Sequence, residues 1–332
     1  MMNKPSGAAG VLLAILLAAP VSAREFLPAL VYGGNKYDKG FNEMAFVGAE
    51  RFKKDFAARY LEVQTTNDTQ KEQSLRAMAR RADMVIAVGV SFTPAVEIVA
   101  REFPRTRFVM IDAAARGANV ASVLFREQEG AFLVGMAAAM KSRSGSVGFI
   151  GGMGLPLIRS FACGYVQGAR FVDGKIRVIQ NMAWDTQIGF SDPARGAELA
   201  RSQFDRGADV IFSAANLTTL GVLQQARDSG KLAIGVDSNQ NGLYPGTVLT
   251  SMVKRVDNAV YAAMKSGKEK GWKAGATSFG LKEGGVDWAL DAHNRALITP
   301  EMEARINAAR DGIVAGRLKV VDYRSRNACP VS

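Results

Sequence analysis

Short apolar runs alternate with amphipathic stretches of ten or more residues along most of the chain. Runs such as 84–88 and 107–111 have the length of strands, whereas the stretch 41–59 carries apolar residues at helical spacing. Strands that alternate with helices in this way form parallel sheets through right-handed crossovers. The pattern therefore predicts an α/β fold, and 332 residues suffice for two domains of roughly 150 residues each.

The alternation occurs in two successive series. The first has predicted strands at 26–32, 61–64, 84–88, 107–111 and 120–125, with helices at 41–59, 71–80, 94–103 and 130–141. The second has strands at 146–150, 175–181, 210–213, 232–236 and 248–252, with helices at 155–172, 192–206, 217–229, 255–265 and 299–315. We expect two doubly wound parallel-sheet lobes joined by a hinge. One lobe is expected to comprise 24–142 and about 255–280, and the other 143–254 and about 281–325.

The first 23 residues form a separate segment. Lys4 precedes an apolar run at 11–19, and small residues follow at Val21, Ser22 and Ala23. This pattern is typical of a cleavable signal peptide; the alternative is a buried N-terminal helix. We expect a mature chain that begins near Arg24 and is located in the periplasm. No cysteine follows the apolar run, so no lipid anchor is expected.

Two cysteines and one histidine restrict the possible chemistry. Cys163, Cys329 and His293 cannot form a zinc site of the usual kind, nor a nucleophile–histidine group unless His293 takes part. His293 lies in a polar segment, which favours a surface position. We expect no metal site and no catalytic residues. An exported protein permits a Cys163–Cys329 disulfide, and a buried thiol with a free thiol in the tail is an equal alternative.

Two signals for other ligands are weak. The chain has a formal net charge of +11, but its basic residues occur in separate small groups without a nucleic-acid-binding motif. A glycine-rich stretch around Gly152 and Gly154 lacks the third glycine of the dinucleotide fingerprint. We therefore expect neither a nucleic-acid partner nor a nucleotide cofactor, and no cofactor of any other kind.

Polar and aromatic residues collect directly after the predicted strands. Ligands of parallel α/β sheets bind at the carboxyl ends of strands, so two lobes that face each other would enclose a cleft there. The residues at these ends include Tyr32, Asp38, Asp112, Phe190, Asn216, Asp237 and Lys254. Aromatics, amides, carboxylates and one cation suit a small polar ligand with a flat portion. Each residue taken alone could equally be a helix cap, a turn or part of a core.

Several strings between residues 26 and 315 together resemble one protein family. They are GGNKYDKGFNEMAFVGAERF, VMID, FREQEGAFLVGMAAAMKS, VGFIGGMGLPLIRSF, GADVIFSAAN, AIGVDSNQ, PGTVLTSMVKRVDNAVY and GLKEGGVDWAL. The family is that of the basic membrane proteins, the nucleoside-binding components of bacterial ABC importers. The resemblance implies a type I periplasmic-binding-protein fold. It also implies a purine nucleoside or related base as ligand and an ABC permease of the inner membrane as partner; we expect a monomer.

The resemblance also implies roles for individual residues. Phe41 matches the aromatic that stacks on the purine, and Phe190 matches a second aromatic from the other lobe. Asp237 and Lys254 match the residues that hold ribose hydroxyls. The remaining predicted ligand contacts are Tyr32, Asp38, Asn42, Asp112 and Asn216.

One position departs from the family pattern. The first strand of the nucleoside binders usually ends in an aspartate that bonds the purine edge, and Tyr32 stands at that position here. A tyrosine cannot supply a carboxylate acceptor. A free base, a different nucleoside or another flat solute therefore remains an alternative ligand. An exported nucleoside hydrolase that uses the cleft carboxylates, and a ligand sensor for a membrane signalling protein, are alternative functions.

Overall fold

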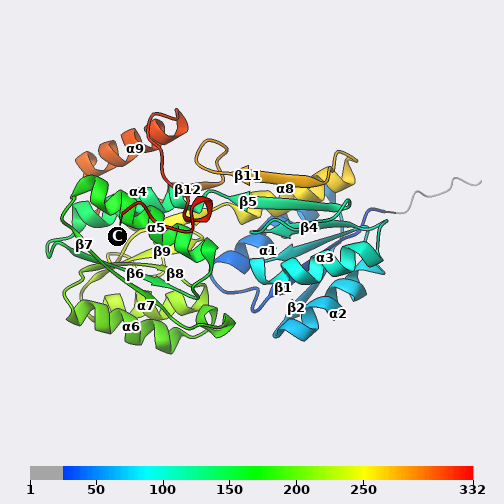
Figure 1. Cartoon of the computed structure of the whole chain (residues 1–332), viewed down its shortest axis with the longest axis horizontal. Helices are drawn as coiled ribbons and strands as arrows, with labels where there is room; N and C mark the ends of the chain where they lie inside the picture. The colour runs from blue at the N-terminus through cyan, green and yellow to red at the C-terminus, as the bar shows by residue number, and fades with distance from the viewer. Residues whose placement is uncertain (1–24, 332) are drawn as a thin grey trace, which may run out of the picture.

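The computed structural model describes residues 25–331, so the predicted signal peptide lies outside the described part. Two six-stranded sheets form two lobes (Figure 1). The N-terminal end of the described chain lies at the far end of the first lobe, and the C-terminus lies on the second. No helix within residues 25–331 is long and apolar enough to cross a membrane.

The first lobe contains a wholly parallel sheet in the order β11-β5-β4-β3-β1-β2. Its strands are β1 (Pro28–Gly33), β2 (Leu61–Thr65), β3 (Met84–Val88), β4 (Arg107–Ile111), β5 (Val120–Phe125) and β11 (Gly275–Phe279). Helices α1 (Phe41–Phe56) and α8 (Val256–Lys268) cover one face. Helices α2 (Asp68–Ala79) and α3 (Thr93–Glu102) cover the other, with the short helix η1 (Val90–Phe92) before α3.

The second lobe contains a sheet in the order β12-β10-β9-β8-β6-β7, in which only the β10–β12 pairing is antiparallel. Its strands are β6 (Ser146–Gly151), β7 (Arg177–Met182), β8 (Val210–Ala214), β9 (Leu232–Asp237), β10 (Val248–Lys254) and β12 (Val286–Trp288). Helices α4 (Glu127–Lys141) and α5 (Pro156–Val172) cover one face, and α9 (Pro300–Val314) packs on α4. Helices α6 (Pro193–Asp205) and α7 (Leu217–Asp228) cover the other face. The short helices η2 (Gln187–Phe190) and η3 (Tyr323–Ser325) complete the lobe.

Helix α4 packs on α5 at unusually close range, as its content of alanine and glycine predicts. A Cβ atom at Gly135 would lie 2.2 Å from the Tyr165 carbonyl oxygen, and one at Gly168 would lie 1.9 Å from that of Phe132. Only glycine permits these backbone approaches. The contacts assign α4 to the second lobe, whereas the expected boundary at residue 142 assigned it to the first. The helix is apolar on nearly every side, so its sequence pattern does not say which sheet it covers.

Between residues 25 and 331 the chain passes from one lobe to the other at three places. These are Arg126 between β5 and α4, Arg255 between β10 and α8, and residues 280–285 between β11 and β12. The expected lobe boundary between residues 254 and about 255 matches the second of these. Every predicted strand and helix is present with ends shifted by a few residues, and the two-lobed α/β fold is confirmed. The short strands β11 and β12 were not predicted, because one is largely exposed and the other has three residues.

Candidate functional site

A cavity lined by residues of both lobes lies at the carboxyl ends of their strands, and it holds about 660 Å3 of space when its part open to solvent is included. Seven of the nine predicted contacts line it: Phe41, Asn42, Asp112, Phe190, Asn216, Asp237 and Lys254. Residues separated by up to 213 positions thus meet in one cavity, and they come from both lobes and the hinge.

The two predicted stacking rings come from opposite lobes. Phe41 is the first residue of α1, and the preceding Asp38 carboxylate accepts hydrogen bonds from the backbone N–H groups of Gly40, Asn42 and Glu43. These bonds fix the start of the helix and therefore the direction of the Phe41 side chain. Phe190 is the last residue of η2 in the second lobe. Both rings line the cavity.

Phe190 rests against the glycine-rich turn after β6. A Cβ atom at Gly152 would lie 2.4 Å from Cδ1 of Phe190, so a larger residue cannot occupy that position without moving the ring. The glycine at position 152 thus has a structural reason of its own. It does not require a dinucleotide phosphate bound to the glycine-rich turn. It makes room for an aromatic wall of the cavity.

Three cavity residues have unusual backbone conformations. Asp112, Asn216 and Asp237 have φ angles of 79°, 46° and 64°, in a region that residues other than glycine seldom adopt. Asp112 follows β4, Asn216 follows β8 and Asp237 ends β9. Such conformations cost about 1–3 kcal/mol each and cluster at binding and active sites. The strain therefore marks the same strand ends that the sequence pattern indicates.

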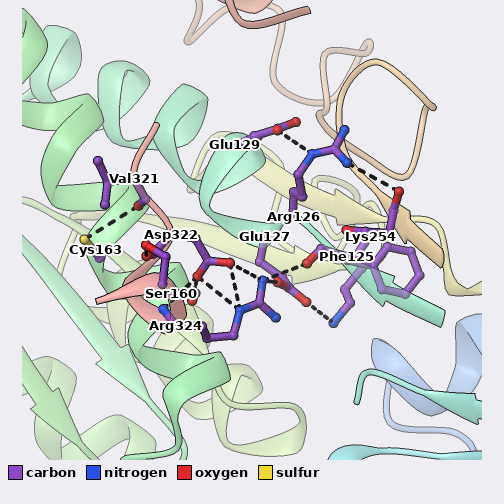
Figure 2. A network of polar contacts seen from close by, with 12 residues as sticks. Phe125, Arg126, Glu127, Glu129, Ser160, Cys163, Lys254, Val321, Asp322 and Arg324 are labelled. Carbon is purple, nitrogen blue, oxygen red and sulfur yellow. Dashed lines mark hydrogen bonds and ion pairs between the residues drawn. The ribbon is translucent and has the colours of Figure 1, made fainter. Parts of the chain in front are cut away.

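Lys254, the last residue of β10, is a buried cation that faces carboxylates of two elements. Its Nζ lies 2.5 Å from Oδ1 of Asp112 and 3.2 Å from Oε1 of Glu127, and the side chain is only 1% exposed. The rings of Phe41, Phe125 and Phe161 surround the same ammonium with centroids 5.0–5.6 Å away. Figure 2 shows the ion pair with Glu127. These contacts together fix the position of the lysine ammonium.

The site carries more acidic groups than basic ones. Burial raises the pKa of Asp237 to about 7; the neighbouring carboxyls of Asp112, Asp38 and Glu127 add to the rise, and Lys254 opposes it. Burial alone would lower the pKa of Lys254, but the carboxylates of Asp112, Glu127 and Asp237 outweigh that effect and raise it. The lysine therefore stays charged, while Asp237 exchanges a proton near neutral pH.

Asn42, one of the residues that line the cavity, has a buried acceptor without a partner in the described part of the chain. Its Nδ2 donates hydrogen bonds of 3.1 Å to the carbonyl oxygens of Gly33 and Asn35. Its Oδ1 is buried and has no hydrogen-bond partner among residues 25–331. A buried acceptor without a partner costs about 1–3 kcal/mol. A ligand N–H group at this point would remove that penalty.

Two predicted contacts lie outside the cavity wall. Asp38 lines an adjoining pocket, and its oxygens accept hydrogen bonds from backbone N–H groups at the start of α1. Tyr32 is fully buried in the core beneath α1, and its hydroxyl donates a 3.4 Å hydrogen bond to Glu62. Side chains alternate along a strand. Tyr32 and Leu30 therefore lie on the same face of β1, the one that α1 covers. The structure therefore does not place Tyr32 in contact with a ligand in this cavity.

Sequence reasoning missed Glu127 and an apolar wall formed by Leu157, Ile158 and Phe161. Glu127 follows β5 after one residue, so the strand-end criterion that found Asp112 would also have found it. The apolar residues lie near the start of α5 and are indistinguishable from core residues by pattern.

The two cysteines form a disulfide, which decides between the two interpretations of the sequence. Cys163 on α5 and Cys329 in the C-terminal tail have Cα atoms 5.5 Å apart. The bond joins the tail to the second lobe.

Comparison with known proteins agrees with this geometry. Residues 27–319 match the family described as "ABC transporter substrate-binding protein PnrA-like". An uncharacterized lipoprotein of Pyrococcus furiosus is 32% identical over 272 residues, which is 78% of this chain and 68% of that protein. Basic membrane protein A of Borreliella burgdorferi is 30% identical over 298 residues, covering 86% of this chain and 85% of the relative.

Solved structures show the same two-lobed fold. A solute-binding protein of an ABC transporter system from Aeropyrum pernix superposes with a TM-score of 0.83 at 26% identity, covering 91% of this chain and 95% of that one. A solute-binding protein from Conexibacter woesei superposes with a TM-score of 0.73 at 21% identity, covering 90% and 99%. The second likeness concerns the fold alone.

Proposed function

Because the chain belongs to the PnrA-like family of ABC transporter substrate-binding proteins, we propose that it captures a purine nucleoside, or a related free base, between Phe41 and Phe190. The observation that carries the proposal is that these two rings come from different lobes and line one cavity with a carboxylate, an amide and a buried ammonium. A flat heterocycle with polar edges matches that combination.

The second ring explains how a ligand favours lobe closure. A ligand shifts an open–closed equilibrium only by its difference in affinity for the two states. Phe41 alone can stack on a base in the open form, whereas Phe190 reaches it only when the lobes approach. Direct contacts between the lobes add to the closed state: the Lys39 carbonyl oxygen accepts hydrogen bonds of 2.6 Å from Ser238 and 2.9 Å from Gln240.

The polar groups favour a nucleoside over a free base. Asp237 and Lys254 offer an acceptor and a donor within one part of the cavity, as adjacent hydroxyls of a ribose require. Asn42 Oδ1 offers an acceptor for an N–H group of the base. Asn42 would then take over the role of the aspartate that the nucleoside binders usually carry at the position of Tyr32. Base recognition would need no carboxylate at the end of β1.

The family implies delivery of the bound solute to a membrane permease. We propose that the mature protein works in the periplasm without a lipid anchor, as a monomer, and releases its ligand unchanged to an ABC permease of the inner membrane. The lipoprotein name of the Pyrococcus relative agrees with export, and whether this chain also carries a lipid anchor is open to experiment. Mass determination of the processed protein, isolated from the cells that make it, distinguishes a lipidated from an unlipidated N-terminus.

The ligand itself can be identified directly. The protein, purified without refolding, is denatured and the released small molecules are analysed by mass spectrometry. Calorimetry with inosine, adenosine, guanosine, hypoxanthine and ribose follows on ligand-free protein. We expect a nucleoside to be released and to bind at least tenfold more tightly than its free base. Recovery of a base and free ribose after incubation with the nucleoside would favour the hydrolase alternative instead, and a sugar as the bound molecule would refute the proposal.

A further inference from the structure

The C-terminal tail reaches the ligand cavity through a chain of ionic contacts. The tail follows α9, lies beyond the residues that match the family, and passes along α5. One stripe of α5 holds it: Ser160 donates a 2.5 Å hydrogen bond to Asp322, Cys163 forms the disulfide with Cys329, and Gln167 bonds both backbone groups of Val321. The tail is therefore a docked part of the second lobe.

Arg324 is the residue of the tail that points toward the hinge. Its guanidinium donates a 2.9 Å hydrogen bond to the carbonyl oxygen of Phe125 and a 2.9 Å hydrogen bond to Oε2 of Glu127. Asp322 holds the same guanidinium from the other side through bonds of 2.8–3.1 Å. Figure 2 shows Arg324 between Asp322 and Glu127. A side chain from the tail thus binds the first of the three crossings.

Glu127 connects that arginine to the ligand site. The side chain is fully buried; Oε2 faces Arg324 at 2.9 Å and Oε1 faces the Lys254 ammonium at 3.2 Å. Lys254 in turn lines the cavity and pairs with Asp112. One buried carboxylate therefore bridges a cation of the tail and a cation of the binding site.

The charges around Lys254 explain why a second cation is needed beside Glu127. Around Lys254 stand three acidic groups, Asp112, Glu127 and Asp237, and Lys254 alone cannot compensate them. Arg324, which is shared between Glu127 and Asp322, supplies the second cation beside Glu127. With Arg324 in place, Glu127 is held by two partners, and the ammonium of Lys254 stays between Glu127 and Asp112, where it faces the cavity. Without it, Glu127 would depend on Lys254 alone and draw the ammonium away.

We propose that Arg324 is a positioning residue for ligand binding: the disulfide-anchored tail holds Glu127 through Arg324, and Glu127 holds Lys254 in the cavity. The consequence for nucleoside affinity rests on the proposed function, whereas the position of Lys254 does not. The test therefore reads both quantities separately.

The first readout needs no ligand. In protein labelled with 15N-lysine, the Nζ resonance of the buried Lys254 is assigned by comparison with Lys254→Met. We expect Arg324→Met to shift this resonance or broaden it by exchange, and the matched variant Arg326→Met, at an exposed position two residues further along the tail, to leave it unchanged. An unaltered resonance in folded Arg324→Met protein would overturn the proposal whatever the ligand is.

The second readout is the affinity for inosine in a double-mutant cycle. We expect Arg324→Met to weaken binding by fivefold or more in the wild-type background and by less than twofold in the Glu127→Gln background, because the neutral amide no longer needs the arginine. Equal losses in both backgrounds would mean that the tail acts by general packing, which contradicts the proposal. If wild-type protein binds no nucleoside, the proposed function fails, and the lysine resonance still decides the role of Arg324.

Discussion

Lys254 Nζ lies 2.5 Å from Oδ1 of Asp112, and this ion pair joins the last residue of a strand in one lobe to the residue after a strand in the other. Both side chains are buried and both line the cavity between the lobes. The pair therefore belongs at once to the hinge and to the candidate ligand site.

Removal of the cation should destabilise the ligand-free protein. Lys254→Met leaves buried carboxylates without their partner, and breaking a buried ion pair in this way typically costs about 3–5 kcal/mol. Urea unfolding at pH 7 measures the loss. The exposed Lys282→Met serves as control and should change the free energy of unfolding by less than ~0.5 kcal/mol. Similar values for the two variants would show that Lys254 is not structurally engaged.

Both aromatic walls should contribute to affinity. Phe41→Ala and Phe190→Ala are each expected to weaken inosine binding by about 1–3 kcal/mol, as alanine substitution does at other base-stacking platforms. Phe171→Ala, at a side chain that is 56% exposed and does not line the cavity, is the control. Calorimetry that finds no loss for either cavity variant would remove the stacking arrangement from the site.

Gly152 should be essential for the position of Phe190. Gly152→Ala places a methyl group 2.4 Å from the ring, so we expect the ring to move and inosine affinity to fall by tenfold or more. At Gly154 a Cβ atom would meet only the flexible end of Arg159 at 3.2 Å, and Gly154→Ala should bind almost normally. Equal affinities of the two variants would contradict the close contact with Phe190.

Asp237 should make the ligand-free protein less stable as pH rises. Its pKa is about 7 in the folded protein and about 3.9 in an unfolded chain. Between these values the folded state holds a proton that the unfolded state has released, so this group lowers the free energy of unfolding progressively from pH 4 to pH 7.

Asp237→Asn removes this dependence. At pH 8 the variant should be more stable than the wild type by on the order of 2–4 kcal/mol, because one pKa unit is worth about 1.4 kcal/mol. At pH 4 the difference should disappear. Urea unfolding at both pH values measures it, with the exposed Asp185→Asn as control. A difference independent of pH would show that burial of Asp237 does not perturb its titration.

The disulfide should stabilise the folded protein through the tail. It links residues 166 positions apart, and loss of a disulfide that closes a long loop typically costs about 2–5 kcal/mol. Cys163→Ala combined with Cys329→Ala should lower the melting temperature. A reducing agent should lower the wild-type melting temperature toward that of the variant without affecting the variant. Thiol labelling of native protein before reduction would detect free cysteines and contradict the bond.

Local pattern alone was sufficient for most of the fold. Strands 84–88, 107–111 and 120–125 were predicted with the ends that the structure shows, because a buried parallel strand is a continuous apolar run between turn residues. The strand-end residues Asp112, Asn216, Asp237 and Lys254 could be predicted for a topological reason. Parallel strands present their carboxyl ends at one edge, so residues far apart in sequence must meet there.

The sequence by itself thus determined the two-lobed α/β architecture and the family, as well as the strand ends that form the cavity, since all of these follow from periodicity and order along the chain. The tertiary structure alone decided which sheet α4 covers, and that Tyr32 faces the core. It also decided that Cys329 reaches Cys163 and that Arg324 reaches Glu127 across 197 positions. These are contacts between elements, and no local pattern encodes the partner that a side chain meets once the helices and sheets are packed.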